Sequence, residues 1–225
     1  MRPNCFNGKI TMEWKRKSFL KFPRISRIGK ANVMKEDTSQ ELRIRILDEA
    51  AKQFDKKGIK FTMDDLAHAL GMSKKTIYTV FEDKRSIMTQ TIDRFFDDAL
   101  IEEEMILNDE TLTIPEQLTA IIGRVPERYT QNDLSQLYVL KEKYPSVYRH
   151  WKFCRENYWD GVAVLLERGL KEGSIRPVSM PILKTMFQAT IEQFFQKDVL
   201  VKNHIPYREA LAQVADILVN GIIVK

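Results

Sequence analysis

Residues 73–81, SKKTIYTVF, place groups that bind anions on one short segment. Lys74 and Lys75 supply positive charge, and the serine, threonine and tyrosine side chains supply hydroxyl donors. Lysine is unfavourable at the start of a helix, because the helix dipole already places about half a positive charge there. We therefore expect the two lysines to face an anion when the protein works, and phosphate is an anion that helix starts bind.

The elements around this segment read as two short helices. Thr62 and Asp65 form the T-x-x-D pattern of a capping box, which begins a helix, and Gly71 has the C-cap chemistry that ends it. Ser73 is suited to start the next helix. The side of that helix expected to pack inward carries Ile77, Val80 and Phe81.

The outer side of the second helix then follows from helix geometry. A turn of about 100° per residue places Lys75, Tyr78 and Thr79 outward, with Thr76 at the edge and Lys74 on the flank. Two helices joined by a short Gly-containing turn, with the second exposing its N-terminal residues, are typical of a helix-turn-helix that enters the DNA major groove. A small helical hairpin with a solvated charged face is the alternative.

A third helix precedes this pair. From Ser39 to Lys57 apolar residues recur at steps of three and four, and Gly58 follows as a stop signal. The face expected to be buried carries Ile44, Leu47, Ala51 and Phe54. Together the three helices predict a small DNA-binding domain over residues 39–84.

The remaining chain has helical periodicity and no strand pattern. Long helices are expected at 84–107 and 146–171, and further helices at 181–200 and 206–224. The predicted fold is therefore all-α, with about nine helices: the N-terminal helix-turn-helix domain, then a helical ligand-binding and dimerisation bundle over residues 85–225.

Positive charge is concentrated at the N-terminus. Residues 1–33 carry nine Lys or Arg against one acid, whereas the whole chain has a formal charge of +5. We expect residues 1–38 to be a basic, disordered extension. It could add sequence-independent affinity for phosphates or act as a targeting or membrane-surface segment, or Met34 could be the first native residue.

Composition and motifs leave little support for an enzyme. The two cysteines, Cys5 and Cys154, lie far apart without metal-like spacing, and the three histidines are on separate segments, so no metal, cofactor or catalytic site is predicted. No hydrolase, metalloprotease or phosphate-loop motif occurs in the sequence. No apolar run reaches the roughly 18–20 residues of a membrane span. We expect a cytoplasmic protein; a helical enzyme without a recognisable motif and a nonspecific DNA-binding protein remain alternatives.

Residues 45–88 closely resemble the DNA-binding domain of the TetR family of bacterial transcriptional regulators. The positions that match the family pattern in the second helix and after it are Ser73, Lys74, Thr76, Ile77, Tyr78, Phe81 and Lys84. The departures are Lys75 for the usual glycine, Thr79 for the usual aromatic residue and Val80 for the frequent histidine. They lie on or near the base-reading face, so they leave the operator sequence open.

The resemblance implies a role for each matched position. Thr62, Tyr78 and Lys84 would hold backbone phosphates of a double-stranded operator. Lys75, Thr76 and Thr79 would approach bases, and Ser73 and Lys74 would contribute at the helix start.

The resemblance also implies a dimer and a small-molecule effector. The last two helices would form the homodimer interface, with candidates Ile191, Phe194, Phe195, Leu211 and Leu218. An effector of unknown identity would bind in the bundle, with candidates Tyr138, Trp151, Tyr158 and Phe187, and would release a repressor from a palindromic operator. Each of these apolar residues could equally be ordinary core, and activation in place of repression is also open.

Overall fold

The computed structural model describes the backbone of residues 30–126, 137–196 and 199–224, with side chains for 39–126, 139–194, 199–200 and 202–224. The chain falls into two units, Met1–Glu41 and Leu42–Lys225, and the sites described below belong to the second. Within the described residues, the second unit is helical without a strand, and Ile175 and Ile223 form an isolated antiparallel bridge. The all-α prediction is confirmed.

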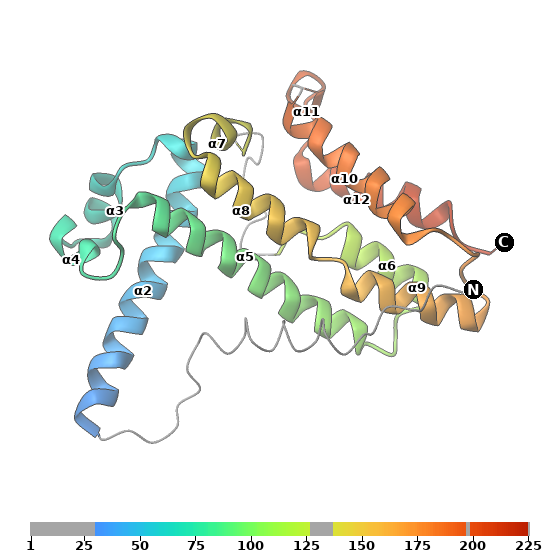
Figure 1. The fold of residues 1–225 in the computed structure, drawn as a ribbon, viewed down its shortest axis with the longest axis horizontal. Coiled ribbons are helices and arrows are strands. Elements are labelled where there is room, and N and C mark those ends of the chain that lie inside the picture. The colour runs from blue at the N-terminus through green and yellow to red at the C-terminus, as the bar shows by residue number, and fades with distance from the viewer. Residues whose placement is uncertain (1–29, 127–136, 197–198, 225) are drawn as a thin grey trace, which may run out of the picture. The chain divides into compact units, whose positions relative to one another are not determined.

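The predicted helices of the DNA-binding domain are present (Figure 1). Their bounds are α2 Lys30–Lys57, the 3-10 turn η1 Gly58–Lys60, α3 Met63–Leu70 and α4 Lys74–Tyr78. Helix α2 begins well before the predicted Ser39, at Lys30, and the basic residues before it lie outside the described chain. We call residues Leu42–Asp83 the head.

The core of the head differs in one respect from the predicted face. Ile44 is 39% exposed, whereas Ile46 is fully buried and Ala50 nearly so. The helix is therefore rotated relative to the predicted stripe. The other buried residues of this core include Leu47, Ala51, Ile59, Phe61, Leu66, Ala67, Ile77 and Phe81.

The remaining helices form the bundle, with α5 joining it to the head. Their bounds are α5 Lys84–Leu107, α6 Ile114–Ile122, α7 Leu137–Lys143, α8 Pro145–Glu156, α9 Asp160–Glu172, α10 Met180–Gln196, α11 Val199–Lys202 and α12 Tyr207–Asn220. Helix α5 contacts α8 and α9, α6 contacts α9 and α12, and α10 contacts α12. In the part of the chain described here, no helix is long and apolar enough to cross a membrane.

The prediction of one long helix over 146–171 is wrong, because this segment forms two helices, α8 and α9, separated at residues 157–159. The Asn157 side chain donates to the Phe153 carbonyl over 2.7 Å and satisfies the end of α8. Trp159 then leaves the helical conformation, with φ −142° and ψ 3°. The break directs the Tyr158 hydroxyl to the Ala99 carbonyl of α5, 2.8 Å away.

Candidate functional site: a nucleic-acid interface and an apolar cavity

The turn before α3 is held by reciprocal hydrogen bonds. The Asp65 amide donates to the Thr62 hydroxyl over 3.1 Å, and the Thr62 amide donates to the Asp65 carboxylate over 2.8 Å. Lys57 binds the same carboxylate at 2.6 Å and, with these bonds, lowers the pKa of Asp65 to about 2. The capping box predicted from T-x-x-D is confirmed, and Thr62 stays exposed at the surface.

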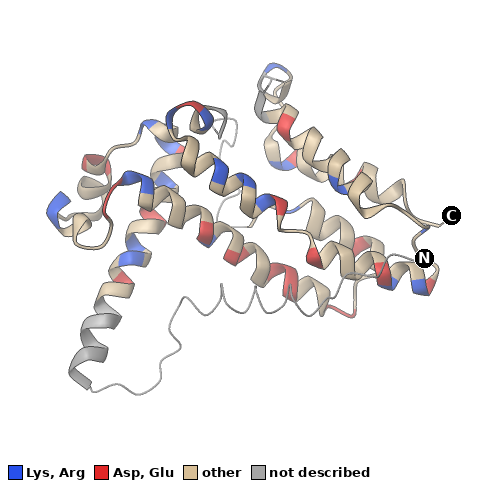
Figure 2. Cartoon of the chain, in the orientation of Figure 1, with Lys and Arg blue, Asp and Glu red and all other residues tan. Residues whose placement is uncertain are grey.

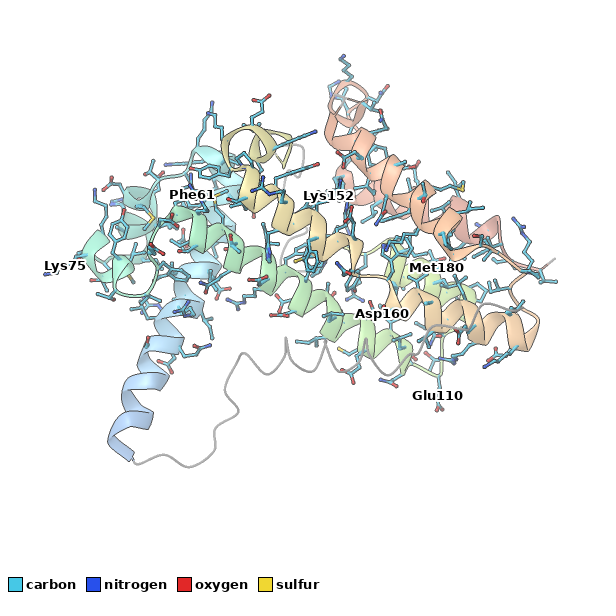
Figure 3. The ribbon with its side chains drawn as sticks, in the orientation of Figure 1. Phe61, Lys75, Glu110, Lys152, Asp160 and Met180 are labelled. Atoms are coloured by element: carbon cyan, nitrogen blue, oxygen red, sulfur yellow. The ribbon has the colours of Figure 1, made fainter. Side chains whose placement is uncertain are left out.

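The two lysines at the start of α4 have different surroundings. Lys74 forms an ion pair with Asp64 of α3 at 3.0 Å, which offsets its charge against the helix dipole. Lys75 is exposed and has no ion-pair or hydrogen-bond partner among the residues the structure describes. Figure 3 shows Lys75 pointing away from the protein, and Figure 2 shows the positive charge at the outer end of α4. Lys75 is thus the cation on α4 most available to a partner.

Hydroxyl groups surround Lys75 on the same surface. Ser73 caps α4 by accepting from the Thr76 amide over 3.1 Å, and the Ser73 and Thr76 hydroxyls are 3.0 Å apart. The Thr79 hydroxyl donates to the Thr76 carbonyl over 2.6 Å. Tyr78 is 50% exposed, a large exposure for an aromatic ring. The structure therefore brings the predicted residues of 73–79 together on one side of α4.

Lys84 is placed differently from the other predicted DNA-binding residues. Its ammonium donates to the carbonyls of Ile59 and Phe61 at 2.5 Å each and lies 4.1 Å from the centre of the Phe61 ring. Burial lowers the pKa of Lys84. This lysine holds the turn before α3 against the start of α5. That Lys84 binds backbone phosphates of DNA stays a prediction, and its contacts within the protein favour a structural role.

Arg43 anchors the other end of α4, and the sequence patterns did not single it out. Its guanidinium lies 4.9 Å from the centre of the Phe81 ring and donates to the Val80 carbonyl over 3.3 Å. A second bond of 2.5 Å reaches Gln90 on α5. Because Arg43 contacts both the end of α4 and α5, it links the orientation of the DNA-contacting surface to the long helix. Local spacing carries no signal for such a contact.

An apolar cavity of about 180 Å³ lies in the bundle. Helix α5 supplies much of its wall, and residues of α2, α6, α7, α8, α9, α10 and α12 and of the segments between helices complete it. Trp151, Tyr158 and Phe187, three of the four predicted effector contacts, line it. The Tyr138 side chain lies outside the described residues. For comparison, an engineered cavity of about 150 Å³ holds benzene.

Arg155 of α8 is a cavity-wall residue with unmet hydrogen-bonding capacity. Its side chain is 11% exposed and stacks 4.5 Å from the centre of the Trp151 ring. Nη2 donates weakly to Glu192 over 3.4 Å, whereas buried Nε and Nη1 have no partner in the described chain. A buried donor without an acceptor costs about 1–3 kcal/mol. The arrangement suits a molecule that brings an acceptor into the cavity.

A second charged group in the wall already has a counterion. Glu102 and Arg124 form an ion pair at 2.7 Å. Tyr158 is half-buried beside Glu103, and both desolvation and that negative charge raise the pKa of its hydroxyl well above the ordinary value. Gly161 makes this packing possible, because a Cβ there would overlap the Glu103 carboxylate. These residues shape one side of the cavity.

The predicted dimer residues divide by burial. Ile191 and Leu211 are 2% and 4% exposed and line the cavity, so they have almost no surface for a partner. Phe194 and Leu218 are half-buried, and the Phe195 side chain lies outside the described residues. The exposed face of α10 carries instead Ile182, Thr185, Met186, Ala189 and Gln193, without a charge.

Comparison with known proteins agrees with this geometry. Residues 46–91 match the model of the bacterial regulatory proteins of the tetR family. The HTH-type transcriptional regulator YvaF of Bacillus subtilis is 28% identical over 182 residues, covering 79% of this chain and 94% of YvaF.

Two solved structures share the fold. A transcriptional regulator from Saccharomonospora viridis, in complex with choline, has a TM-score of 0.66 and 20% identity, covering 83% of this chain and 100% of its own. FadR from Bacillus subtilis, in complex with stearoyl-CoA, has a TM-score of 0.58 and 19% identity, covering 80% and 98%. At this identity they establish the architecture alone.

The helix-turn-helix head and the helical bundle define a DNA-binding transcriptional regulator. The match over residues 46–91 assigns this segment to the tetR family of bacterial regulatory proteins, as the resemblance in residues 45–88 predicted.

Proposed function

We propose that the chain reads a palindromic operator as a homodimer and that an effector in the apolar cavity releases it. The observation that supports DNA binding is the outward Lys75, which has no ion-pair or hydrogen-bond partner in the described chain. It lies on α4, whose other side buries Ile77. A helix of this width enters the major groove, where a lysine reaches the acceptors of guanine. Thr76 and Thr79 lie beside it.

A binding selection from randomised duplex DNA at physiological salt tests the DNA half. The full-length protein should enrich a palindrome, with half-sites about 34–36 Å apart. On that operator, Lys75→Ala should weaken binding by about five- to 150-fold, the loss of about 1–3 kcal/mol. Lys74→Ala is the matched control and should lose less, because Asp64 already pairs this lysine. Equal binding by Lys75→Ala and the parent protein would count against base reading.

Salt dependence separates this reading from nonspecific binding through the basic N-terminus. Phosphate contacts lose affinity steeply with salt for every sequence alike, whereas base contacts leave a sequence preference at high salt. No preference between the selected operator and scrambled DNA would favour the nonspecific alternative.

The effector we propose has an apolar body and a hydrogen-bond acceptor, such as a carboxylate or carbonyl. The cavity wall is mainly apolar, and the unpartnered Nε and Nη1 of Arg155 supply the donors. Choline and stearoyl-CoA in the two structural relatives differ widely in chemistry, so the fold itself does not select a ligand. The class of effector therefore has to be inferred from the residues that line the cavity of this chain.

A thermal-shift screen of aliphatic and aromatic carboxylates, with the matching alcohols and amines, tests this class. Carboxylates that stabilise the parent protein should also release the operator. The double variant Arg155→Met with Glu192→Gln removes both charges and keeps an acceptor for the Tyr148 hydroxyl, which lies 3.0 Å from Glu192. Its stability should stay within about 1 kcal/mol, because uncharged replacement of a buried pair is often neutral. Retained carboxylate binding in this variant would reject Arg155 as the anchor.

For the dimer we propose the exposed faces of α10 and α12 in place of the buried positions. Ile182 and Met186 are 60% and 54% exposed on α10, and Ile217 is 70% exposed on α12. Exposed apolar residues on two helices in contact are typical of a partner surface. Sedimentation should show a dimer for the parent protein and a monomer for Met186→Arg. A parent monomer at micromolar concentration would remove the dimer proposal.

A further inference from the structure

Three side chains with metal-binding atoms meet where α5 lies against α8. Asp93 comes from α5, and His150 and Cys154 lie one turn apart on α8. The His150 Nε2 atom is 2.6 Å from Asp93 Oδ1 and 3.6 Å from Cys154 Sγ. All three ligand atoms lie within 4.8 Å of one another. The three side chains therefore converge on one point between two helices.

The spacing is close to that of a tetrahedral zinc site. With Zn–N near 2.0 Å and Zn–S near 2.3 Å, the nitrogen and sulfur of a tetrahedral site are about 3.5 Å apart. The observed separation of Nε2 and Sγ is 3.6 Å. Asp93 Oδ1 would have to move away from Nε2 by about 0.7 Å, because oxygen and nitrogen ligands of such a site lie about 3.3 Å apart. Asp93 is 46% exposed and can make this movement.

The donor set indicates the class of metal. An imidazole nitrogen, a thiolate sulfur and a carboxylate oxygen suit zinc and similar borderline ions, whereas magnesium and calcium prefer oxygen alone. Asp97 lies one turn from Asp93, and burial together with the charges of Asp93 and Asp98 raises its pKa. Figure 2 shows acidic residues following one another along α5. This concentration of negative charge favours a dication.

We propose that Asp93, His150 and Cys154 bind a divalent ion of the zinc class and link α5 to α8. Three protein ligands leave a fourth position for water or another ligand. The ion would hold together two helices that form the cavity wall, since Met88 of α5 and Trp151 of α8 line the cavity. The site is separate from the cavity itself, because its three ligands are not part of the cavity lining.

The sequence contains a weak sign of this site. His150 and Cys154 are spaced i, i+4 on a predicted helix, which places them on one face. Asp93 is far away in the chain and joins them through the packing of α5 on α8. The competing reading is a plain ion pair, in which the hydrogen bond from His150 to Asp93, with Cys154 nearby, raises the pKa of His150 to about 10.

Cobalt and zinc titrations of the full-length chain separate the two readings. The background is Cys5→Ser, so that Cys154 is the one thiol present. One equivalent of Co²⁺ should give a thiolate-to-cobalt charge-transfer band and the strong d–d bands of tetrahedral cobalt, and Zn²⁺ should displace it. Cys154→Ser should remove the charge-transfer band, and His150→Gln and Asp93→Asn should each weaken Zn²⁺ binding at least tenfold. His204→Ala is the control and should bind as the parent protein does.

Alkylation of Cys154 by iodoacetamide gives a second readout that does not depend on spectra. Zn²⁺ should slow the reaction at least tenfold in the Cys5→Ser protein and leave it unchanged in Cys5→Ser with His150→Gln. Circular dichroism establishes that each variant is folded. Absence of stoichiometric cobalt binding, or equal zinc affinity with and without Cys154, would overturn the site and leave the ion pair. Neither readout involves DNA or an effector, so failure here leaves the regulator function standing.

Discussion

The turn before α3 and the cavity wall differ in how far their polar groups are paired. In the turn before α3, Thr62 and Asp65 exchange hydrogen bonds, and Lys57 forms an ion pair with Asp65. Lys84 donates to two carbonyls of the same turn. In the cavity wall, Arg155 keeps two buried nitrogens without an acceptor in the described chain. The turn before α3 thus pairs its own polar groups, whereas the cavity wall keeps two donors that find no acceptor in the described chain.

This difference in pairing matches what each region has to do in a ligand-responsive DNA-binding protein. A surface that reads bases has to be rigid, since its side chains must meet fixed groups in the groove. A cavity that senses a molecule benefits from unmet groups, because a ligand that satisfies them shifts the balance between conformations. Two residues connect the head to α5. Arg43 of the head donates to Gln90 of α5 and to the Val80 carbonyl. Lys84, the first residue of α5, donates to the Ile59 carbonyl of the head.

The largest effect is expected from Lys84→Met, which tests whether the head is held by internal bonds. The substitution keeps the apolar stem and leaves the carbonyls of Ile59 and Phe61 without their donor, at a cost of about 2–4 kcal/mol in unfolding free energy. Urea denaturation measures this. Lys60→Met, at an exposed lysine of the same turn, is the control and should be nearly neutral. Unchanged stability with lost operator binding would instead support the phosphate role of Lys84.

Gly161→Ala tests close packing at the cavity wall. The added methyl group overlaps the buried Glu103 side chain, and overpacking of this kind costs about 1–3 kcal/mol. A double-mutant cycle with Glu103→Ala should recover part of the loss, because the overlap is then removed. Additive losses in the cycle would show that another contact makes the glycine necessary.

Gly71→Ala tests the head at a position where backbone conformation, and not space, requires glycine. Gly71 has φ 64° at the end of α3, and a Cβ there meets no atom within 4 Å. Alanine in this left-handed conformation should cost about 1 kcal/mol. Gly71→Asn should cost less, since asparagine tolerates this region. Equal thermal midpoints for alanine and asparagine would contradict the conformational explanation.

The smallest effect concerns the pH dependence of the head. The pKa of Asp65 is lowered to about 2, chiefly by its bond with Lys57. A carboxylate with a depressed pKa stabilises the fold fully above its ordinary pKa of 3.8, and this contribution is lost as the pH falls toward 2. Thermal midpoints of the parent protein should therefore fall more steeply between pH 4 and pH 2 than those of Asp65→Asn. Parallel curves would show that Asp65 does not contribute.

The sequence by itself determined the head in detail. Capping residues, C-terminal glycines and the apolar positions of a helix act within a few residues of one another. The spacing of Thr62, Asp65 and Gly71 therefore predicted where α3 begins and ends. The outward position of Lys75 followed from helix geometry and is what the structure shows. The start and end of α5 were also predicted, at Lys84 and Leu107.

The bundle depended on contacts between distant segments. No proline or glycine marks the break between α8 and α9, and the Tyr158 hydroxyl meets α5 only in the folded chain. Ile191 and Leu211 look like interface residues in sequence because burial in the chain's own core and burial by a partner require the same apolar side chains.

Tertiary structure alone decided the chemistry of the interior. It left Arg155 with unmatched donors in an apolar wall, and it brought Asp93 to His150 and Cys154 from another helix. Local sequence patterns show where a helix begins and ends and which of its faces is apolar. Which side chains face one another across two helices is fixed by how the helices pack, and that depends on the whole chain at once.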